Sequence, residues 1–239
     1  MKPLQQFEIR SLLPLKLWGW DISLTNSALF MILAVVLLTI FFTIALRKSQ
    51  VVPSKTQSLA EVPLDFLSHM VKETNGVVGL PYLSLICSIF FFVFMGNFLG
   101  LFPYAFTFTS QLIVNFALAL IVIGAITVIG VIKQGFGYLR IFWPSGVPAL
   151  VAPILVPIEI ISYFSRPVSL AIRLFANMVA GHSMMKIFGY FSVMLGIAGV
   201  LPLAINIALI LFEGLVAFLQ AYVFAILSCI YLNDALHGH

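Results

Sequence analysis

Glu159, Arg166 and Arg173 follow one another at intervals of seven residues in a part of the chain that is otherwise largely apolar. Seven residues of α-helix turn through about 700°, so the three side chains form one slowly drifting stripe, and Asn177 lies on the same face. Arginine does not lose its proton in proteins, and burying its charge in a bilayer costs at least about 2.5–3.5 kcal/mol. Charged residues within membrane helices usually mark the path of an ion or a proton. This stripe therefore indicates ion or proton transport.

A second polar stripe lies close to the C-terminus, where Glu213 and Gln220 are seven residues apart and Asp234 follows fourteen residues later. If this helix folds back antiparallel on the first, residues at equal depth have position numbers with a constant sum. Three pairs fit, with sums of 393, 393 and 395: Glu159 with Asp234, Arg173 with Gln220, and His182 with Glu213. The three pairs centre between 196 and 198, a stretch flanked by Gly196 and Gly199, and glycines allow a turn there.

These pairs predict two proton-exchanging sites with a fixed cation between them. Carboxylates and imidazole can relay protons because their pKa values can be tuned across the working pH. Arg173 cannot relay a proton; it would bar direct leakage and favour the ionised form of a carboxylate that passes it. A proton would then cross the membrane only on a separate, moving carrier.

Simpler interpretations stay open for individual residues. Glu159 and Arg166 could form a structural ion pair, and His182 could be an interior histidine whose hydrogen bonds are satisfied locally. Asn97, which lies near the end of an apolar run, could line an aqueous cavity or cap backbone groups.

The composition predicts which elements must hold these side chains. Only 8% of the 239 residues are charged and 62% are hydrophobic, whereas soluble domains carry about 25% charged residues. Residues 22–46 and 74–132 contain no Asp, Glu, Lys or Arg, and about 20 apolar residues suffice to cross a bilayer as a helix. We expect an all-α polytopic membrane protein with about five membrane helices plus one surface amphipathic helix, the last two membrane helices forming a long, steeply tilted hairpin.

The expected organisation is a single membrane domain over residues 1–239. Its parts are a polar lead, 1–26; membrane helices, 27–46, 80–102 and 111–132; a surface helix, 58–74; and the hairpin, 150–188 and 200–235. A helix of about 38 residues is about 57 Å long, whereas the hydrocarbon core is about 30 Å thick, so each arm of the hairpin must tilt or break.

Basic residues predict the orientation of the chain, because they concentrate on the cytoplasmic or matrix side of a membrane. If the spans alternate, five basic residues share one side: Arg47, Lys48, Lys55, Lys133 and Arg140.

The sequence contains no phosphate-binding glycine loop, no metal-ligand spacing and no basic cluster. We therefore expect no cofactor, no metal ion and no nucleic-acid partner, and any ATP chemistry must occur on another polypeptide.

Two segments resemble a known family closely. Ser-Arg-Pro-Val-Ser-Leu-Ala-Ile-Arg-Leu-Phe-Ala-Asn-Met-Val-Ala-Gly-His, at 165–182, is similar to the core motif of subunit a of the rotary F-type ATP synthase. Leu-Gln-Ala-Tyr-Val-Phe-Ala-Ile-Leu-Ser-Cys-Ile-Tyr-Leu-Asn-Asp-Ala, at 219–235, is similar to the last helix of that family. The resemblance extends to 6–9 and 95–110, and so covers nearly the whole chain.

The resemblance implies a role for each matching residue. Arg173 matches the family's essential arginine, which faces the ring of c subunits, and Gln220 matches its partner on the last helix. His182 and Glu213 match the pair of the half-channel open to the proton-rich side, in the order found in mitochondria and alphaproteobacteria. The remaining matches are grouped by half-channel, with Asn97 on the outer side and Glu159, Asn177 and Asp234 on the inner side, and Arg166 in support.

The resemblance also implies a non-catalytic, proton-translocating stator subunit in an energy-coupling inner membrane, either mitochondrial or alphaproteobacterial. Its expected partners are the c-ring, the peripheral-stalk (b-type) and other membrane-sector subunits, the lipid bilayer and protons. Two other classes stay open. A proton-coupled secondary transporter would show paired halves with broken helices, which this sequence lacks. A structural scaffold would tolerate neutral replacement of its charges.

Overall fold

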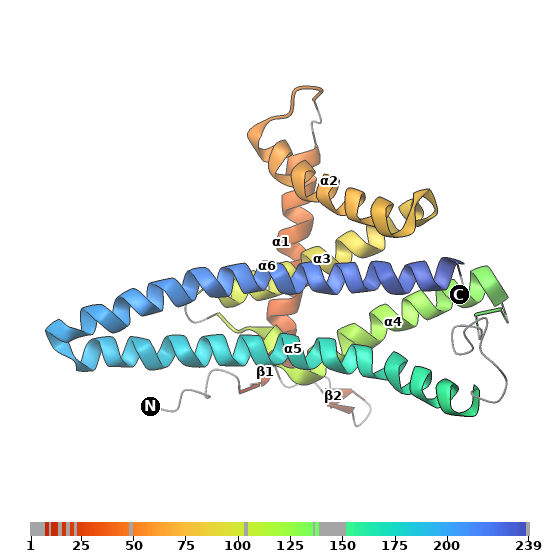
Figure 1. The fold of residues 1–239 in the computed structure, drawn as a ribbon. Helices are drawn as coiled ribbons and strands as arrows, with labels where there is room; N and C mark the ends of the chain where they lie inside the picture. The colour runs from red at the N-terminus through yellow and green to blue at the C-terminus, as the bar shows by residue number, and fades with distance from the viewer. Residues whose placement is uncertain are drawn as a thin grey trace. The chain divides into compact units, whose positions relative to one another are not determined.

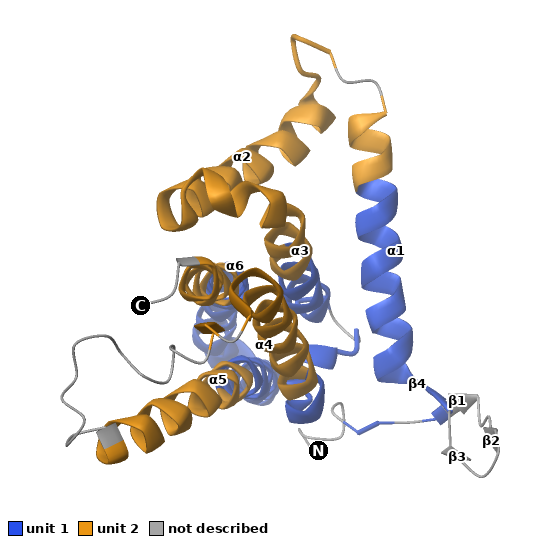
Figure 2. Cartoon of the chain, turned by 90° about the vertical axis from the view of Figure 1, so that its right-hand side faces the viewer, with its two compact units in different colours: residues 1–41, 91–114, 173–221 blue, residues 42–90, 115–172, 222–239 orange. Residues whose placement is uncertain are grey.

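The computed structural model describes residues 8–9, 11–13, 16–17, 20–21, 23–47, 50–102, 105–135, 137–138 and 152–237. Much of the polar lead therefore lies outside the described residues, as do Lys48 and Arg140 of the predicted orientation. The chain divides into two compact units (Figure 2). Unit 1 comprises Met1–Phe41, Phe91–Val114 and Arg173–Ala221, and unit 2 comprises Phe42–Phe90, Asn115–Ile172 and Tyr222–His239.

Six α-helices account for most of the described chain (Figure 1). They are α1 (Asn26–Leu46), α2 (Lys55–Asn75), α3 (Leu83–Gly100), α4 (Leu112–Gln134), α5 (Ala152–Met194) and α6 (Val200–His237). Short 3-10 turns precede three of them: η2 (Val77–Tyr82), η3 (Phe108–Ser110) and η5 (Gly196–Gly199). All of these elements except α2 and η3 belong to five apolar segments long enough to cross a membrane. The predicted all-α polytopic class is therefore confirmed.

The polar lead contains the only strands found in the described residues. β1 (Ser11–Leu13) pairs antiparallel with β4 (Leu24–Thr25), and β2 (Lys16–Leu17) pairs antiparallel with β3 (Trp20–Asp21). The inner pair nests within the outer one, so the lead folds back on itself before α1. These strands are two or three residues long and do not alter the fold class.

α2 has the amphipathic pattern expected of a surface helix. Ser54 caps its N-terminus, since the Ser54 hydroxyl accepts a hydrogen bond from the Gln57 backbone N–H at 3.3 Å. The helix ends at Gly76, whose φ of 64° a residue with a side chain rarely adopts. Leu67 and Val71 lie buried on one face, while the charged positions of the last turn are exposed. Its placement on the headgroups stays a prediction.

A cluster of apolar side chains fixes the loop between α3 and α4 in unit 1. Phe106 and Phe108 pack with Ala34 of α1, and the ring of Phe108 lies against Gly96 of α3. A Cβ atom at Gly96 would lie 2.4 Å from Phe108 Cζ, so only glycine allows this approach. The cluster holds the residues that precede η3 close to the end of α3.

The hairpin of α5 and α6 turns at η5, where the sequence predicts it. Gly196 has a φ of +55°, and a Cβ atom at Gly199 would lie 2.0 Å from the carbonyl oxygen of Ser192. A glycine is therefore needed at both positions. On either side of this turn the two helices run side by side within unit 1 (Figure 1).

α5 is unbroken although two prolines, Pro157 and Pro167, lie inside it. Proline has no backbone N–H, so each removes one hydrogen bond of the helix.

α6 is tied to α4 in unit 2, because Gln134 Nε2 donates to the Ala235 carbonyl oxygen at 2.8 Å. This contact holds the C-terminal end of α6, which carries Asp234.

Candidate functional site

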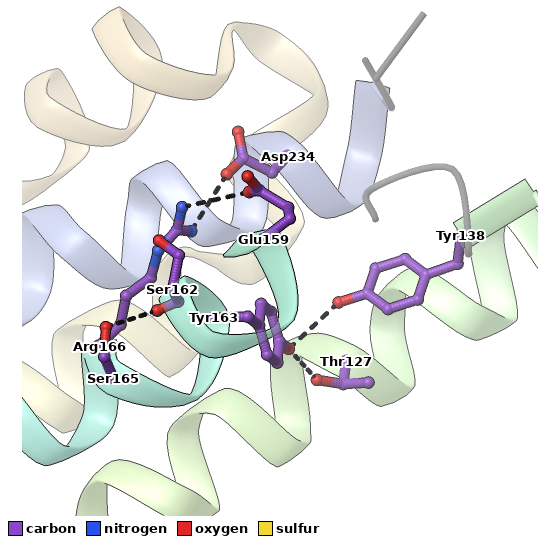
Figure 3. Close-up of polar contacts among 8 residues, drawn as sticks. All are labelled: Thr127, Tyr138, Glu159, Ser162, Tyr163, Ser165, Arg166 and Asp234. Atoms are coloured by element: carbon purple, nitrogen blue, oxygen red, sulfur yellow. Dashed lines mark hydrogen bonds and ion pairs between the residues drawn. The ribbon is translucent and has the colours of Figure 1, made fainter. Parts of the chain in front are cut away.

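In unit 2, Arg166 lies between the two acidic residues that the family resemblance assigns to the inner half-channel. Its guanidinium lies 3.9 Å from Glu159 Oε1 and 3.9 Å from Asp234 Oδ2 (Figure 3). The three side chains are 24–31% exposed, and the Tyr231 ring lies 5.1 Å below the guanidinium carbon. One cation and two anions leave a net charge of −1 when all three side chains are ionised.

Hydroxyl groups from three segments form a second polar group in unit 2. The Tyr163 hydroxyl lies 2.6 Å from Thr127 Oγ1 and 3.3 Å from the Tyr138 hydroxyl (Figure 3). Burial is the main cause that raises the pKa of the Tyr138 phenol above its ordinary value, so this hydroxyl stays protonated. A cavity of about 10 Å³, enough for about one water molecule, lies between the two groups. It is lined by Arg166 and Asp234 and by three tyrosines: Tyr138, Tyr163 and Tyr231.

In unit 1, His182 and Glu213 face each other across the hairpin. His182 Nε2 lies 3.5 Å from Glu213 Oε1, and the side chains are 11% and 5% exposed. The same nitrogen lies 3.2 Å from Thr107 Oγ1, which comes from the loop before η3. A carboxyl, an imidazole and a hydroxyl therefore meet at one buried point, and these are groups that exchange protons.

Glu213 is poorly supplied with hydrogen bonds for a buried acid. Among the described residues, neither of its carboxylate oxygens has a hydrogen-bond partner, although His182 Nε2 lies 3.5 Å from Oε1. Gly181 makes room for it, since a Cβ atom there would lie 2.7 Å from Glu213 Oε1. A buried acceptor without a partner costs free energy, and such groups are found where a function uses them. The two oxygens of Glu213 are therefore candidates to bind a proton or a water molecule.

Asn97 lies fully buried in the same unit. Its Nδ2 donates to the Ala217 carbonyl oxygen at 3.4 Å, one turn after Glu213 on α6. Within the described part of the chain, its Oδ1 has no hydrogen-bond partner. The side chain both ties α3 to α6 and presents an unused acceptor, so both interpretations drawn from the sequence remain.

Arg173, Gln220 and Asn177 do not form a hydrogen-bonded group. Arg173 is exposed, and across the described residues no carboxylate lies within 4.0 Å of its guanidinium, in contrast to Arg166. Gln220 is buried and Asn177 is half-buried. Asn177 belongs to unit 1, whereas the other predicted inner-side residues, Glu159 and Asp234, belong to unit 2.

The structure adds polar residues that the sequence does not single out. Their side chains are neutral hydroxyls or amides: Thr107, Thr127, Tyr138, Tyr163, Tyr231 and Asn206. A spacing signal exists only for Asn206, which stands seven residues before Glu213 and has a buried Oδ1 without a hydrogen-bond partner among the described residues. Among the residues that the structure describes, no group of three or more His, Cys, Asp or Glu side chains is placed to hold a metal ion.

Comparison with known proteins identifies the family. The sequence profile described as ATP synthase A chain matches residues 28–233, which is most of the chain. This chain belongs to that family. It is 53% identical over 239 residues to the ATP synthase subunit a of Pelagibacter ubique (strain HTCC1062), covering 99% of this chain and 98% of the relative. It is 49% identical over 242 residues to that of Mesorhizobium japonicum, covering 98% and 96%, and 47% identical over 238 residues to that of Rhodospirillum rubrum, covering 99% of each chain.

Membership of the ATP synthase A chain family confirms the resemblance drawn from residues 165–182 and 219–235. Together with the five apolar segments, it identifies the chain as a multi-pass inner-membrane protein. It also identifies the chain as a subunit of the ATP synthase that has no catalytic activity of its own.

Proposed function

We propose that this chain is the stator subunit of the membrane sector that supplies protons to a rotating ring of c subunits and takes them away again. Its partners are then that ring, the peripheral-stalk and other membrane-sector subunits, and the lipid around them. The observation that carries the proposal is the contrast between two arginines on one helix. Arg166 is held by two carboxylates of its own chain, whereas Arg173 is exposed and lies near none among the described residues. An arginine without its own counter-ion suits a carboxylate supplied by a partner.

The His182–Glu213 site is proposed to deliver the proton from the proton-rich side. Its burial and its contact of 3.5 Å support a direct transfer from imidazole to carboxylate, and the unused acceptor of Asn97 supports a hydrated approach. From Glu213 the proton neutralises a carboxylate of the ring. The neutral site can then face lipid as the ring turns, because an uncharged carboxylic acid is far less costly in hydrocarbon than an ion.

The cluster of Glu159, Arg166 and Asp234 is proposed to accept the proton on the other side. Its two carboxylates supply oxygens that can take a proton, and their partial exposure supports onward release to water. Asn177 is proposed to assist this release from its place on α5. Each proton that crosses moves one charge through the membrane potential, which provides about 2.3 kcal/mol per 100 mV.

Arg173 is proposed to keep the two proton paths separate, with Gln220 assisting from α6. At about 4 Å from a ring carboxylate, a guanidinium would stabilise the ionised form by about 4 kcal/mol at an effective dielectric constant of 20. That energy is about three pKa units, so a carboxylate that passes Arg173 gives up its proton before it continues. A proton cannot follow a direct route past the arginine, because the guanidinium does not release its own.

Purification in mild detergent distinguishes a stator subunit from a secondary transporter. We expect the chain to co-purify with a ring of small hairpin subunits and with a soluble ATPase head. Vesicles that contain this complex should acidify when ATP is added. A chain that purifies alone and still couples proton flow to the uptake of a small molecule would overturn the proposal in favour of a transporter.

Gly181→Ala tests the His182–Glu213 site without replacing a titratable residue. The added Cβ would lie 2.7 Å from Glu213 Oε1 and should push the carboxylate away from the imidazole. Because small misplacements of reacting groups are costly, we expect ATP-driven proton pumping to fall at least about tenfold. Gly189→Ala is the matched control on the same helix, since its Cβ would make only an ordinary contact of 3.7 Å with Asn206. Equal pumping by the two variants would contradict the proposed transfer step.

A further inference from the structure

Thr107 contacts His182, although neither its charge nor its spacing in the sequence predicts this contact. Its side-chain oxygen lies 3.2 Å from His182 Nε2, and the residue is only 4% exposed. The same Nε2 is the atom that lies 3.5 Å from Glu213 Oε1. One ring nitrogen is thus shared between the acid that receives a proton and a hydroxyl that is neither acid nor base at ordinary pH.

These two neighbours of Nε2 differ in the hydrogen bonds that they can make. A carboxylate only accepts hydrogen bonds, whereas a threonine hydroxyl both donates and accepts. When Nε2 carries a proton, the ring can donate it toward Glu213 while the Thr107 oxygen lies beside it as a second acceptor. When the proton passes to Glu213, the N–H bond breaks, an O–H bond forms, and the cation and anion are both neutralised. The bare Nε2 then needs a donor, and the Thr107 O–H can turn to supply one.

The fold clamps Thr107 in this place from two sides. Gly100, at the end of α3, lies so close that a Cβ atom there would be 2.6 Å from Thr107 Oγ1 and 2.7 Å from its methyl carbon. On the other side, the Ser110 hydroxyl donates to the Thr107 carbonyl oxygen at 2.6 Å, and the Ser110 backbone N–H donates to the same oxygen at 3.1 Å. The neighbouring Phe108 is buried against Gly96. The hydroxyl therefore has little freedom to leave the histidine.

From this geometry we infer that Thr107 is a positioning residue, which holds the His182 ring in register with Glu213 in both protonation states of Nε2, and that Gly100 leaves the space this requires. The inference rests on the proposed role of His182 and Glu213 in proton delivery. It extends the proton-transfer site to Thr107, an uncharged loop residue that orients the His182 ring.

Three variants of the complete complex, reconstituted in liposomes, test this inference. Thr107→Val keeps the shape and removes the hydroxyl, whereas Thr107→Ser keeps the hydroxyl and removes the methyl group. We expect ATP synthesis driven by an imposed proton gradient to fall about fivefold in Thr107→Val, the factor that corresponds to one lost hydrogen bond of about 1 kcal/mol. Thr107→Ser should retain nearly full activity. Thr39→Val on α1 is the control, since that hydroxyl donates to the Val35 carbonyl of its own helix.

The pattern across these variants decides the outcome. A loss in Thr107→Val with rescue in Thr107→Ser supports the inference, and the amount of assembled complex and its uncoupled ATP hydrolysis should be unchanged. Equal activity in both variants, equal loss in both, or loss in Thr107→Ser alone overturns it, because none of these follows the hydroxyl. Failure of the proposed function is distinguishable, since Glu213→Gln would then also conduct protons normally.

Discussion

Replacement of Arg173 by alanine is expected to abolish proton-driven ATP synthesis while the complex still assembles. Arg173 is exposed and contacts no carboxylate among the described residues, so its removal leaves no buried anion of this chain without a partner. Assembly should therefore survive. Coupling should not, because the approximately 4 kcal/mol that favours an ionised ring carboxylate would be lost, together with the barrier between the two proton paths. We expect synthesis to fall at least about a hundredfold in reconstituted vesicles.

Arg47→Ala provides a matched control, since this arginine is also exposed but lies at the end of α1. It should leave synthesis unchanged. The passive proton permeability of the vesicles should rise in Arg173→Ala and not in the control. Normal coupled synthesis by a complex that carries Arg173→Ala would remove the central element of the proposed function.

Glu213→Gln is expected to have an effect of similar size for a different reason. Glutamine has nearly the same shape and can fill the same buried space beside Gly181, but its amide cannot take up and release a proton at neutral pH. General acid–base groups contribute about 10²–10⁴-fold, so proton flux through the membrane sector should fall by at least about a hundredfold. Both ATP synthesis and ATP-driven proton pumping should show the loss.

Glu213→Asp separates the need for an acid from the need for contact with His182. Aspartate keeps the carboxyl group but draws it back by one C–C bond, about 1.5 Å, from the imidazole. Partial activity is therefore expected, between that of Glu213→Gln and that of the unchanged chain. Glu73→Gln removes an exposed carboxylate of α2 and should have no effect. Full activity in Glu213→Gln would show that the proton does not pass through this residue.

Much of the fold follows from simple features of the sequence. Uncharged runs longer than about 20 residues predict membrane helices because the bilayer leaves the backbone no other partner for its hydrogen bonds. The register of the hairpin also follows, since the glycine turn at 196–199 fixes which residues lie opposite each other. For that reason the position sums bring His182 to Glu213, which lie in contact.

The same rule is less successful for Arg166. It pairs Glu159 with Asp234, but in the structure Arg166 lies between them and contacts both. The contact with Glu159 is the ion pair that the seven-residue spacing allows, whereas the contact with Asp234 is one that the position sums do not assign to Arg166. Side chains on a helix tilt toward its N-terminus and arginine is long, so Arg166 reaches back to both acids. The hydroxyls of Thr107 and Tyr163 are harder still to predict. Neutral residues leave no charge pattern, and only the packed loop and helices bring them to the two sites.

The two prolines inside α5 have a consequence for the chemistry around Glu159. Because position 157 has no N–H to give to residue 153, and position 167 none to give to residue 163, two main-chain oxygens are released from the helical ladder on either side of this acid. Oxygens freed in this way cannot stay dry in hydrocarbon without a large penalty. This stretch of α5 should therefore need outside partners for two carbonyl oxygens, and water that enters beside Glu159 would supply hydrogen bonds that the helix itself does not make.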